Sequence, residues 1–368
     1  MNNKKLIIFM PSIEGGGVEK NLFLIANYIA SRIKNIGLLT ASRGFDHKFK
    51  NLEIIKPNFN FLKNSGRKFK YIICLLELLK IIITKQNITV FAFQANLYCI
   101  ILCKIFNKKV IIRSNSSPSG WSKNFIKKKI FKFILGLADK IIVNSLDFKK
   151  EFKKKFNINA TCIYNPLNKN EIIKLAKERV NFSFYRKNKR HLKIITIGRF
   201  TDQKDHITLL KAINEIKSKI KFKLLVMGRG INKQKIINYI SENSLNKDVK
   251  VLGFQKNPFK YLNLADLFIL SSRYEGLPNV LLEAASLKKY IISTDCPTGP
   301  REILNDGKGG SLIKIGDHKN LSKNIINYSI NKEKLKKKIN FTYKNLLRFD
   351  KKNNLNKYLN EVKIYLTN

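Results

Sequence analysis

Two carboxylates eight residues apart stand in the stretch 271–284, SSRYEGLPNVLLEA, and they suit a ligand rich in hydroxyl groups. Glu275 and Glu283 can each accept hydrogen bonds from paired hydroxyls, as a sugar or a ribose presents them. Pro278 fits the first turn of a helix, so the amides that follow it could bind a phosphate. For Glu283 alone, an acidic residue favoured by the helix dipole is a competing explanation. The backbone positions expected to contact the same ligand are Gly276, Leu277, Asn279 and Val280.

Two further motifs follow apolar runs and carry groups suited to a nucleoside diphosphate. The first, GRFTDQK, offers Arg199 as a fork of donors and Lys204 as a point charge, and both suit a diphosphate. Two solvated charges in a lysine-rich chain are an equally good explanation on spacing alone. The second, GFQKNP, is a glycine–aromatic turn where Phe254 and Asn257 could help to hold a flat base, largely through backbone hydrogen bonds.

A triplet of glycines at residues 15–17 lies between the first apolar run and the first helical segment. Glycines let the backbone approach a ligand closely, and the helix N-terminus that follows favours an anion. Gly16 and Gly17 are therefore candidates for a phosphate contact, although the G-x-G-x-x-G dinucleotide spacing is absent. A plain turn is the alternative.

Short apolar runs alternate with amphipathic segments, which predicts parallel sheets covered by helices on both faces. The predicted strands are 6–10, 36–40, 88–93, 110–113, 141–144, 161–164, 192–197, 223–227, 249–252, 267–271, 290–293 and 311–315. The predicted helices are 18–32, 69–85, 125–137 and 147–156, with a lysine-rich helical run over 331–366.

This alternation stops at the polar stretch NFSFYRKNKR and restarts at residue 192. We therefore predict an N-terminal Rossmann-like domain over 1–180, a linker over 181–191, a second Rossmann-like domain over 192–345 and a C-terminal helix over 346–368. Two doubly wound domains are expected to bind a ligand in the cleft between them, at the carboxyl ends of their strands.

The composition allows two ordinary domains and adds an extreme positive charge. The chain has 368 residues, 44% of them hydrophobic, and 72 basic against 25 acidic residues give a net charge of +47. This charge favours an anionic partner: a nucleic acid, an anionic membrane face or a phosphorylated substrate. Codon bias in an AT-rich genome would explain the same lysines. A basic nucleic-acid-binding protein is thus an alternative function, but the lysines are spread evenly without a recognised motif, so we expect no nucleic-acid partner.

Neither the cysteines nor the histidines form a metal-binding pattern. The five cysteines contain no C-x-x-C pair, and the four histidines are scattered. Thiols inside apolar runs behave as small hydrophobic groups and suit a reducing cytosol. No signal peptide is recognisable, and no run reaches the ~18 to 20 apolar residues of a membrane span. We therefore expect a cytoplasmic protein without a bound metal.

Together these motifs resemble the retaining glycosyltransferases of family 4, which have the GT-B fold: α/β, with two doubly wound Rossmann-like domains facing across a cleft. Glu275 and Glu283 match the family's E-x7-E signature, and the segment TGPREIL from Thr298 is similar to the one that follows it in many members. Asn165-Pro166 resembles the family's approach to the interdomain linker. The resemblance covers nearly the whole chain and is strongest over 197–304.

The resemblance implies that a sugar is transferred from a nucleotide-diphosphate donor, a UDP-sugar, with retention at the anomeric carbon. Arg199 and Lys204 would hold the diphosphate and offset charge on the departing nucleotide, without a metal or other cofactor. Glu275 would bind the donor sugar, Glu283 the ribose and Phe254 the base. We take Glu275, Arg199 and Lys204 as the candidate catalytic residues.

In the first domain, the resemblance implies that Gly16 and Gly17 lie against the phosphates or the acceptor, and that the final helix crosses back to this domain. Many family members carry a histidine there after a central strand, whereas this chain has Arg113-Ser114-Asn115-Ser116. Either Arg113 or Asn115 takes part on the acceptor side, or the position is dispensable.

Acceptor recognition in this fold falls to the first domain, where segments 67–85 and 121–140 are both apolar and basic. The second carries Trp121 and Phe125 near Lys127, which suits a helix lying on an anionic bilayer. We predict a peripheral enzyme at the inner membrane face, acting on a glycan or lipid-linked acceptor in cell-surface polysaccharide or lipopolysaccharide biosynthesis. A core-facing helix with a solvated lysine face is the alternative.

Other GT-B nucleotide-sugar enzymes, such as an epimerase or a phosphorylase, are the enzymatic alternatives. A phosphorylase needs a phosphate site or a cofactor lysine that no motif here supplies. A degenerate, non-catalytic relative is disfavoured by the full set of Arg199, Lys204, Glu275 and Glu283.

Overall fold

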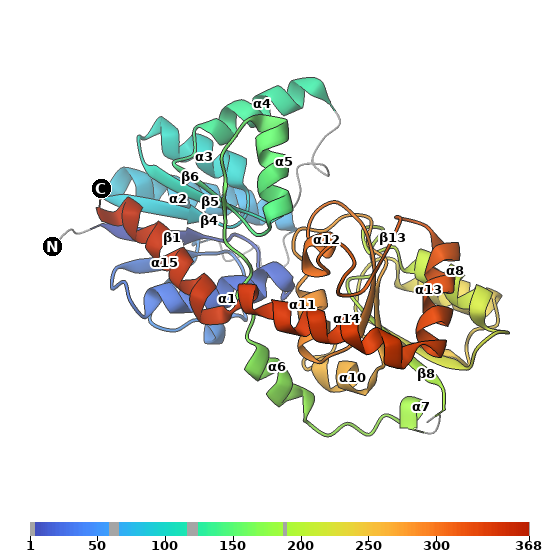
Figure 1. The fold of residues 1–368 in the computed structure, drawn as a ribbon. Helices are drawn as coiled ribbons and strands as arrows, with labels where there is room; N and C mark the ends of the chain where they lie inside the picture. The colour runs from blue at the N-terminus through green and yellow to red at the C-terminus, as the bar shows by residue number, and fades with distance from the viewer. Residues whose placement is uncertain (1–3, 59–65, 116–123, 187–189, 368) are drawn as a thin grey trace. The chain divides into compact units, whose positions relative to one another are not determined.

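The computed structural model describes residues 4–58, 66–115, 124–186 and 190–367. The chain forms two α/β units, one made of Met1–Pro166 with Lys351–Asn368 and the other of Leu167–Asp350 (Figure 1). Each unit is built on its own parallel sheet. The predicted fold class, two Rossmann-like domains, is therefore confirmed.

The first unit has a seven-stranded sheet in the order β3-β2-β1-β4-β5-β6-β7. Its strands are β1 (Lys5–Phe9), β2 (Ile36–Leu39), β3 (Glu53–Ile55), β4 (Ile88–Ala92), β5 (Lys109–Ser114), β6 (Lys140–Val143) and β7 (Thr161–Cys162). Its helices are α1 (Gly17–Ala30), η1 (Asp46–Lys48), α2 (Arg67–Thr84), α3 (Asn96–Ile105), α4 (Phe125–Gly136), α5 (Leu146–Phe156) and α15 (Lys351–Thr367).

Alternate residues of these strands point into two separate cores, because side chains of a strand alternate between its faces. One core packs Ile7 and Val90 of the sheet against α2, α3 and α5. The other packs Ile8 and Phe91 against α1 and α15, including Tyr358 at the middle of α15. The last helix of the chain is thus part of the first unit's core.

The second unit has a six-stranded sheet in the order β10-β9-β8-β11-β12-β13, the same winding as the first. Its strands are β8 (Leu192–Ile197), β9 (Phe222–Met227), β10 (Val249–Leu252), β11 (Leu267–Leu270), β12 (Tyr290–Thr294) and β13 (Ser311–Ile313). Its helices are α6 (Lys169–Ala176), α7 (Ser183–Arg186), α8 (His206–Ile216), α9 (Lys233–Glu242), α10 (Phe259–Leu264), α11 (Asn279–Ser286), α12 (Pro300–Ile303), α13 (His318–Ile330), α14 (Lys332–Asn345) and η4 (Leu346–Phe349).

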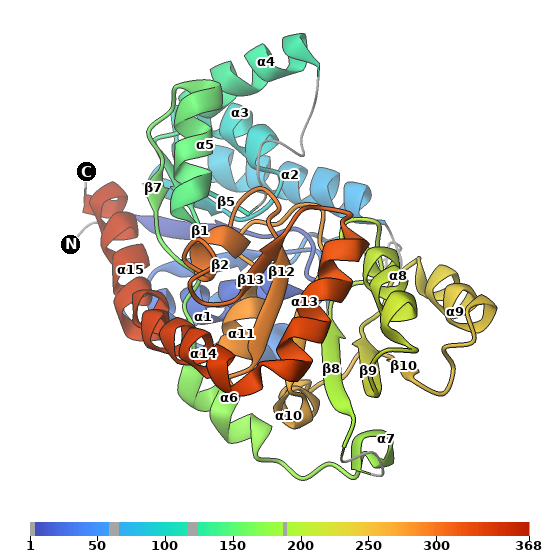
Figure 2. The same ribbon diagram turned by 45° about the vertical axis from the view of Figure 1, so that its right-hand side comes forward.

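Helices α8, α9 and α13 cover one face of this second sheet (Figure 2), where Leu209, Ile236 and Leu321 join a core with Ile194 and Leu267. Helix α6 packs against both α10 and α11, and α11 and α14 contact β12. Helix α8 follows β8 and helix α11 follows β11, and these two strands are neighbours in the sheet.

The units divide at different positions from the predicted domains. The chain passes from the first unit to the second at Pro166–Leu167 and returns at Asp350–Lys351, whereas the linker was expected over 181–191. The polar stretch lies inside the second unit, because the buried Tyr185 donates a hydrogen bond to the carbonyl of Ile194. Residues 187–189 of that stretch lie outside the described residues.

Three elements of the first unit were missing from the predictions: the single turn η1, strand β3 and helix α3. Strand β3 is only three residues long and partly exposed, so it has no apolar signature. Helix α3, NLYCIILCKI, is apolar almost throughout and therefore has little helical period. In the described parts of the chain, no helix is both long and apolar enough to cross a bilayer.

Candidate functional site

Arg199, Lys204 and Glu275, the predicted catalytic residues, gather where the winding of the second sheet reverses. Strands β8 and β11 are hydrogen-bonded neighbours although two strands and their helices separate them in sequence. In a doubly wound sheet, ligands bind at the carboxyl ends of the strands at this reversal. The loop with Arg199 and Lys204 leaves β8, and the loop with Glu275 leaves β11.

Several contacts fasten these two loops to each other. Lys204 Nζ lies 2.5 Å from Glu275 Oε1. Ser271 Oγ donates to the Lys204 carbonyl at 3.0 Å, and the Arg273 amide donates to the Gln203 carbonyl at 2.8 Å. The two loops therefore form one preorganised surface, and residues 71 positions apart in sequence meet on it.

The two cations of the site differ in their surroundings. The side chains of Lys204 and Glu275 are only 13% and 7% exposed, so this ion pair is largely removed from water. Arg199 is exposed, and its guanidinium donates to Gln203 Oε1 at 3.2 Å. Arg199 is thus positioned near the pair and open to a ligand.

The thiol of Cys296 lies close enough to feel the Glu275 charge. Burial, together with that negative charge, raises the pKa of Cys296 to about 12. This residue is therefore a neutral, buried neighbour of the carboxylate.

A third loop, after β12, completes the surroundings of Glu275. Thr298 Oγ1 donates to the Glu275 carbonyl at 2.7 Å. A Cβ on Gly299 would lie 2.2 Å from the carbonyl oxygen of Gly276, so only glycine allows this approach. The backbone around Glu275 is thereby fixed from two sides.

Helix α11 begins at Asn279, with Pro278 just before it at the N-cap position, one position earlier than predicted. Glu283 lies on this helix and is 5% exposed. It is four positions from the helix start, about 6 Å along the axis. Leu277 is buried, whereas Gly276, Asn279 and Val280 are partly exposed next to Glu275.

The loop after β9, Gly228-Arg229-Gly230, is part of this edge and was not predicted. A Cβ on Gly228 would lie 1.8 Å from the Gly198 carbonyl, so this loop packs directly on the loop after β8. The guanidinium of Arg229 lies 5.0 Å from the ring centre of the exposed Phe254. A G-x-G motif after a predicted strand was the signal that could have identified it.

Asn257 has a structural role in the second unit. Its amide nitrogen donates to the Leu175 carbonyl at 2.9 Å and to Glu178 Oε2 at 2.8 Å. Its oxygen accepts from the Phe259 amide at 3.0 Å. These contacts join the ends of α6 and α10, and a contact of this side chain with the base stays a prediction.

In the first unit the glycine loop leaves β1, and α1 begins at Gly17 with Gly16 as its N-cap. Glu19 turns back over the loop, where its Oε1 lies 3.4 Å from the Glu14 amide. A Cβ on Gly16 would lie 2.9 Å from Glu19 Oε2. A buried carboxylate thus stands beside the positions that were predicted to contact a phosphate.

Arg113 is turned inward rather than toward a ligand. It has no exposed surface, and it donates to Tyr358 Oη at 2.9 Å, to Asn165 Oδ1 at 2.6 Å and to Asn115. The amide of Asn115 donates to the Phe93 carbonyl at 2.9 Å. The predicted acceptor role would require this network to open; in the structure, it fastens α15 to the sheet. Ser116 and Trp121 lie outside the described residues.

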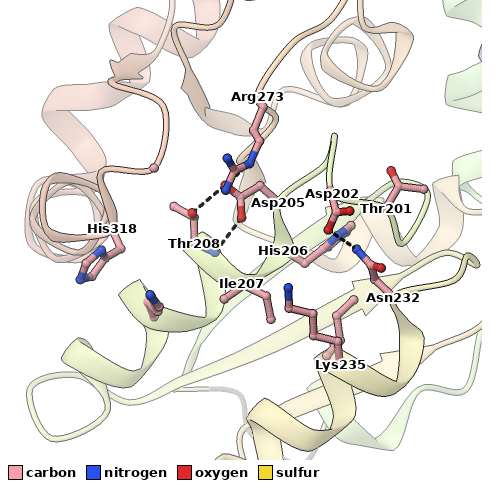
Figure 3. Close-up of a pocket in the computed structure, with 13 residues that line it drawn as sticks. Thr201, Asp202, Asp205, His206, Ile207, Thr208, Asn232, Lys235, Arg273 and His318 are labelled. Carbon is pink, nitrogen blue, oxygen red and sulfur yellow. Dashed lines mark hydrogen bonds and ion pairs between the residues drawn. The ribbon is translucent and has the colours of Figure 1, made fainter.

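No cluster of three or more histidine, cysteine or acidic side chains that could hold a metal occurs among the residues that the structure describes. A pocket does occur beside the loop after β8, lined among others by Asp205, His206 and Arg273 (Figure 3). The predicted donor residues do not line it.

Comparisons with known proteins agree with this architecture. The model of the family "Glycosyl transferases group 1" matches residues 177–345, within the second unit. MJ1059 of Methanocaldococcus jannaschii, an uncharacterized glycosyltransferase, is 36% identical over 217 residues, which cover 56% of this chain and 53% of that protein. A Campylobacter jejuni protein, N-acetylgalactosamine-N,N'-diacetylbacillosaminyl-diphospho-undecaprenol 4-alpha-N-acetylgalactosaminyltransferase, is 27% identical over 364 residues, 93% of each chain.

Among solved structures, Anabaena Alr3699/HepE in complex with UDP-glucose matches with a TM-score of 0.78. It covers 98% of this chain and 99% of its own at 15% identity, so it shows the fold. The comparisons therefore support a glycosyltransferase: the second unit matches the model of the group 1 glycosyl transferases, and both units have the fold of the solved GT-B enzymes.

Proposed function

We propose that this chain is a retaining family 4 glycosyltransferase that moves a sugar from a UDP-sugar to a glycan or lipid-linked acceptor in cell-surface polysaccharide biosynthesis. The observation that carries the proposal is the Lys204–Glu275 pair at the reversal point of the second sheet. The UDP-glucose complex of HepE and the diphospho-undecaprenol substrate named for the Campylobacter enzyme support the donor and acceptor classes.

The charges at this edge suit the departure of a nucleoside diphosphate. Negative charge builds on the diphosphate as its bond to the anomeric carbon breaks, and fixed positive groups stabilise that charge without rearranging. Lys204 and Arg199 supply them in this proposal, so no metal or other cofactor is required. When a phosphate of the donor replaces Glu275 as the partner of Lys204, Glu275 becomes free to accept hydrogen bonds from the donor sugar. Glu283 accepts hydrogen bonds from the ribose.

A thermal-shift screen of nucleotide sugars tests the donor side. A ligand that binds only the folded protein raises its melting temperature by mass action, so we expect a UDP-sugar to do so, with or without EDTA. Arg199→Met and Glu275→Gln should lose this stabilisation. Glu242→Gln, an exposed glutamate on α9 of the same unit, is the matched control. If no nucleotide sugar stabilises the protein, the proposal fails.

The acceptor side of the proposal includes an anionic membrane surface. Helix α3 packs against both α2 and α4, and each of the three exposes apolar side chains. We call this set the α2–α4 surface: Ile72, Leu76, Ile83, Tyr98, Ile101, Ile105, Ile126, Ile130 and Phe133. Exposed lysines at positions 127, 128, 129 and 132 accompany it. Exposed apolar groups beside lysines suit a helix on an anionic bilayer, which supports our proposal of a peripheral protein at the inner face.

Sedimentation with phosphatidylglycerol vesicles tests this membrane contact. The variant Ile126→Ser/Ile130→Ser/Phe133→Ser should bind at least about tenfold more weakly, because each apolar side chain that enters the bilayer contributes on the order of 1.5 kcal/mol or more. The control replaces Ile231, Ile330 and Leu347 by serine, which are exposed apolar residues of the second unit. Equal binding of both variants would remove the membrane from the proposal and leave the donor site untouched.

A further inference from the structure

The second unit contains a pocket of about 250 Å³ that is separate from the proposed donor residues. It opens between the starts of α8 and α9 and the turn before α13, and Figure 3 shows the side chains around it. Arg199, Lys204, Glu275 and Glu283 are absent from its lining. The pocket is therefore available to a second ligand.

Three helix N-termini converge on this pocket. Its lining includes His206 at the start of α8, Asn232 before the start of α9 and His318 at the start of α13. Each helix N-terminus carries a partial positive charge and free amides, which favour an anion. Aspartates cap α8 and α13, whereas Asn232 makes no side-chain capping bond to α9. The amides at the start of α9 thus receive no side-chain cap, although Asp202 accepts a hydrogen bond from Asn232 there.

A buried polar side chain without a partner faces this same space. His206 is 4% exposed, and its Nδ1 has no hydrogen-bond partner among the described residues. The hydroxyl of Thr201, also in the lining, is buried and likewise lacks a partner in the part of the chain that the structure describes. A buried polar group that lacks a hydrogen bond destabilises the folded state, so a ligand that supplied the bond would recover that free energy.

The aspartates in the lining have hydrogen-bond or ion-pair partners, whereas two of its lysines have none among the described residues. Asp202 accepts from Asn232 Nδ2 at 2.8 Å, and Asp205 Oδ2 lies 3.1 Å from Arg273 Nε (Figure 3). Lys211 and Lys235 are exposed and have neither a hydrogen bond nor an ion pair within the described residues. Arg273 therefore neutralises Asp205, and the two lysines outweigh the charge that remains on Asp202, so the net charge of the lining is positive.

We propose that this pocket binds the phosphate group of a small molecule, either a sugar phosphate or free inorganic phosphate. Lys211 and Lys235 supply charge, the start of α9 supplies amides, and Thr201 with His206 supplies the remaining hydrogen bonds. Burial, together with the charge of Lys204, lowers the pKa of His206 to about 4, so the ring is neutral at pH 7 and can donate from one nitrogen.

Residues that line the pocket lie close in sequence to the proposed donor residues Lys204 and Glu275. Asp205 follows Lys204 directly, and its carboxylate holds Arg273, two positions before Glu275. A phosphate that competes for Arg273 or pulls on the start of α8 would change the setting of the Lys204–Glu275 pair. Occupancy of the pocket is thus expected to alter the affinity for a donor, and the change is reciprocal.

Titration with inorganic phosphate tests the site, followed through the ring signals of His206 in protein labelled with ¹⁵N-histidine. We expect saturable shifts of these signals at about 0.15 M salt, where exposed charges are largely screened. Lys211→Gln/Lys235→Gln should weaken binding at least about tenfold, because hydrogen bonds to charged groups contribute about 1.5–3 kcal/mol each. Glucose 6-phosphate is the second arm: tighter binding than phosphate identifies an organic ligand, and equal binding identifies the free ion.

The matched control is Lys219→Gln/Lys221→Gln, which removes the same charge from exposed positions of the same unit away from the pocket. Phosphate shifts at His206 should persist in Arg199→Met, which separates this site from the donor site. The proposal is overturned if neither phosphate nor glucose 6-phosphate moves the His206 signals, or if the control pair weakens binding as much as the pocket pair.

Discussion

The two sheets wind in the same order, but their carboxyl edges are used differently. In the second unit, Arg199 is exposed and Lys204 faces Glu275 across the loops after β8 and β11. In the first unit, Arg113 at the end of β5 is fully buried and bonded to Asn165 and Tyr358. We propose that the first of these edges binds a ligand through its cations, whereas the second uses its arginine to hold the chain's last helix.

This difference teaches that an arginine at a strand end is not by itself a sign of binding. Arg113 makes no ion pair among the described residues, and its guanidinium is satisfied by amide and phenol oxygens. Its neighbours Phe93 and Tyr358 place their rings 5.6 and 5.8 Å from it. A guanidinium so fully enclosed serves the packing of the fold, whereas the exposed Arg199 at the switch point of the second sheet is, in our proposal, available for chemistry.

The largest contrast is expected between two buried lysines. Lys204→Met should lower turnover of the UDP-sugar by about 10²- to 10³-fold, because it removes a group aimed at the leaving diphosphate. Lys5→Met removes an equally buried lysine, paired with Glu53, from the amino end of β1, where a parallel sheet binds no ligand. Release of UDP measures both. Equal losses in the two variants would mean that Lys204 acts only through stability.

The arginines offer the second contrast. Arg113→Met should destabilise the first unit by about 4 kcal/mol, because it leaves several buried oxygens without a donor. Arg199→Met should stay within about 0.5 kcal/mol of the parent protein and lose nucleotide-sugar binding instead. Hydrogen exchange of α15 and of β8 reports the two units separately. Unchanged exchange of α15 in Arg113→Met would contradict the anchoring role.

The stability of the second unit should depend on acid pH, because this unit contains the buried His206. Its pKa is lowered from 6.5 to about 4, so between these values the unfolded chain binds a proton that the folded unit refuses. The unfolding free energy of the second unit should therefore fall as the pH drops from 6.5 to 4, by up to about 3 kcal/mol from this residue. His206→Phe, which can still pack against Phe200, should flatten that slope in hydrogen-exchange measurements. If stability falls equally with pH in the parent protein and in His206→Phe, His206 is not the cause of the acid sensitivity.

Much of this fold could be predicted from the sequence, because each buried parallel strand is a short apolar run with polar residues or glycine directly beside it. The predicted strands 192–197 and 249–252 coincide with β8 and β10. The short strand β3 and the uniformly apolar helix α3 lack a periodic signal and were missed. The division at residues 166 and 350 depends on which elements pack together, which the polarity of 181–191 does not reveal.

The site was predictable as a set of loops but not as a set of contacts. Strand order places the loops of Lys204 and Glu275 side by side, and that follows from the doubly wound pattern. The inward turn of Arg113 could not be foreseen, because its partners Asn165 and Tyr358 lie 52 and 245 positions away. The same holds for the close approach of Gly228 to Gly198, which only the packed loops display.

The smallest expected difference in stability is between the loss of one tyrosine hydroxyl in the first unit, that of Tyr358, and one in the second, that of Tyr290. Tyr358 accepts from the charged Arg113 and donates to the Ile163 carbonyl at 3.1 Å, whereas Tyr290 shares a single neutral hydrogen bond of 2.8 Å with Ser311. Hydrogen bonds to charged groups contribute about 1.5–3 kcal/mol and neutral ones about 0.5–1.5. Tyr358→Phe should therefore destabilise its unit by about 1 kcal/mol more than Tyr290→Phe destabilises the other, as hydrogen exchange in β5 and β12 would measure. Equal costs would mean that Arg113 finds another acceptor when the hydroxyl is gone, and that α15 is anchored by its core packing and its other polar contacts, such as the Lys140–Glu361 ion pair.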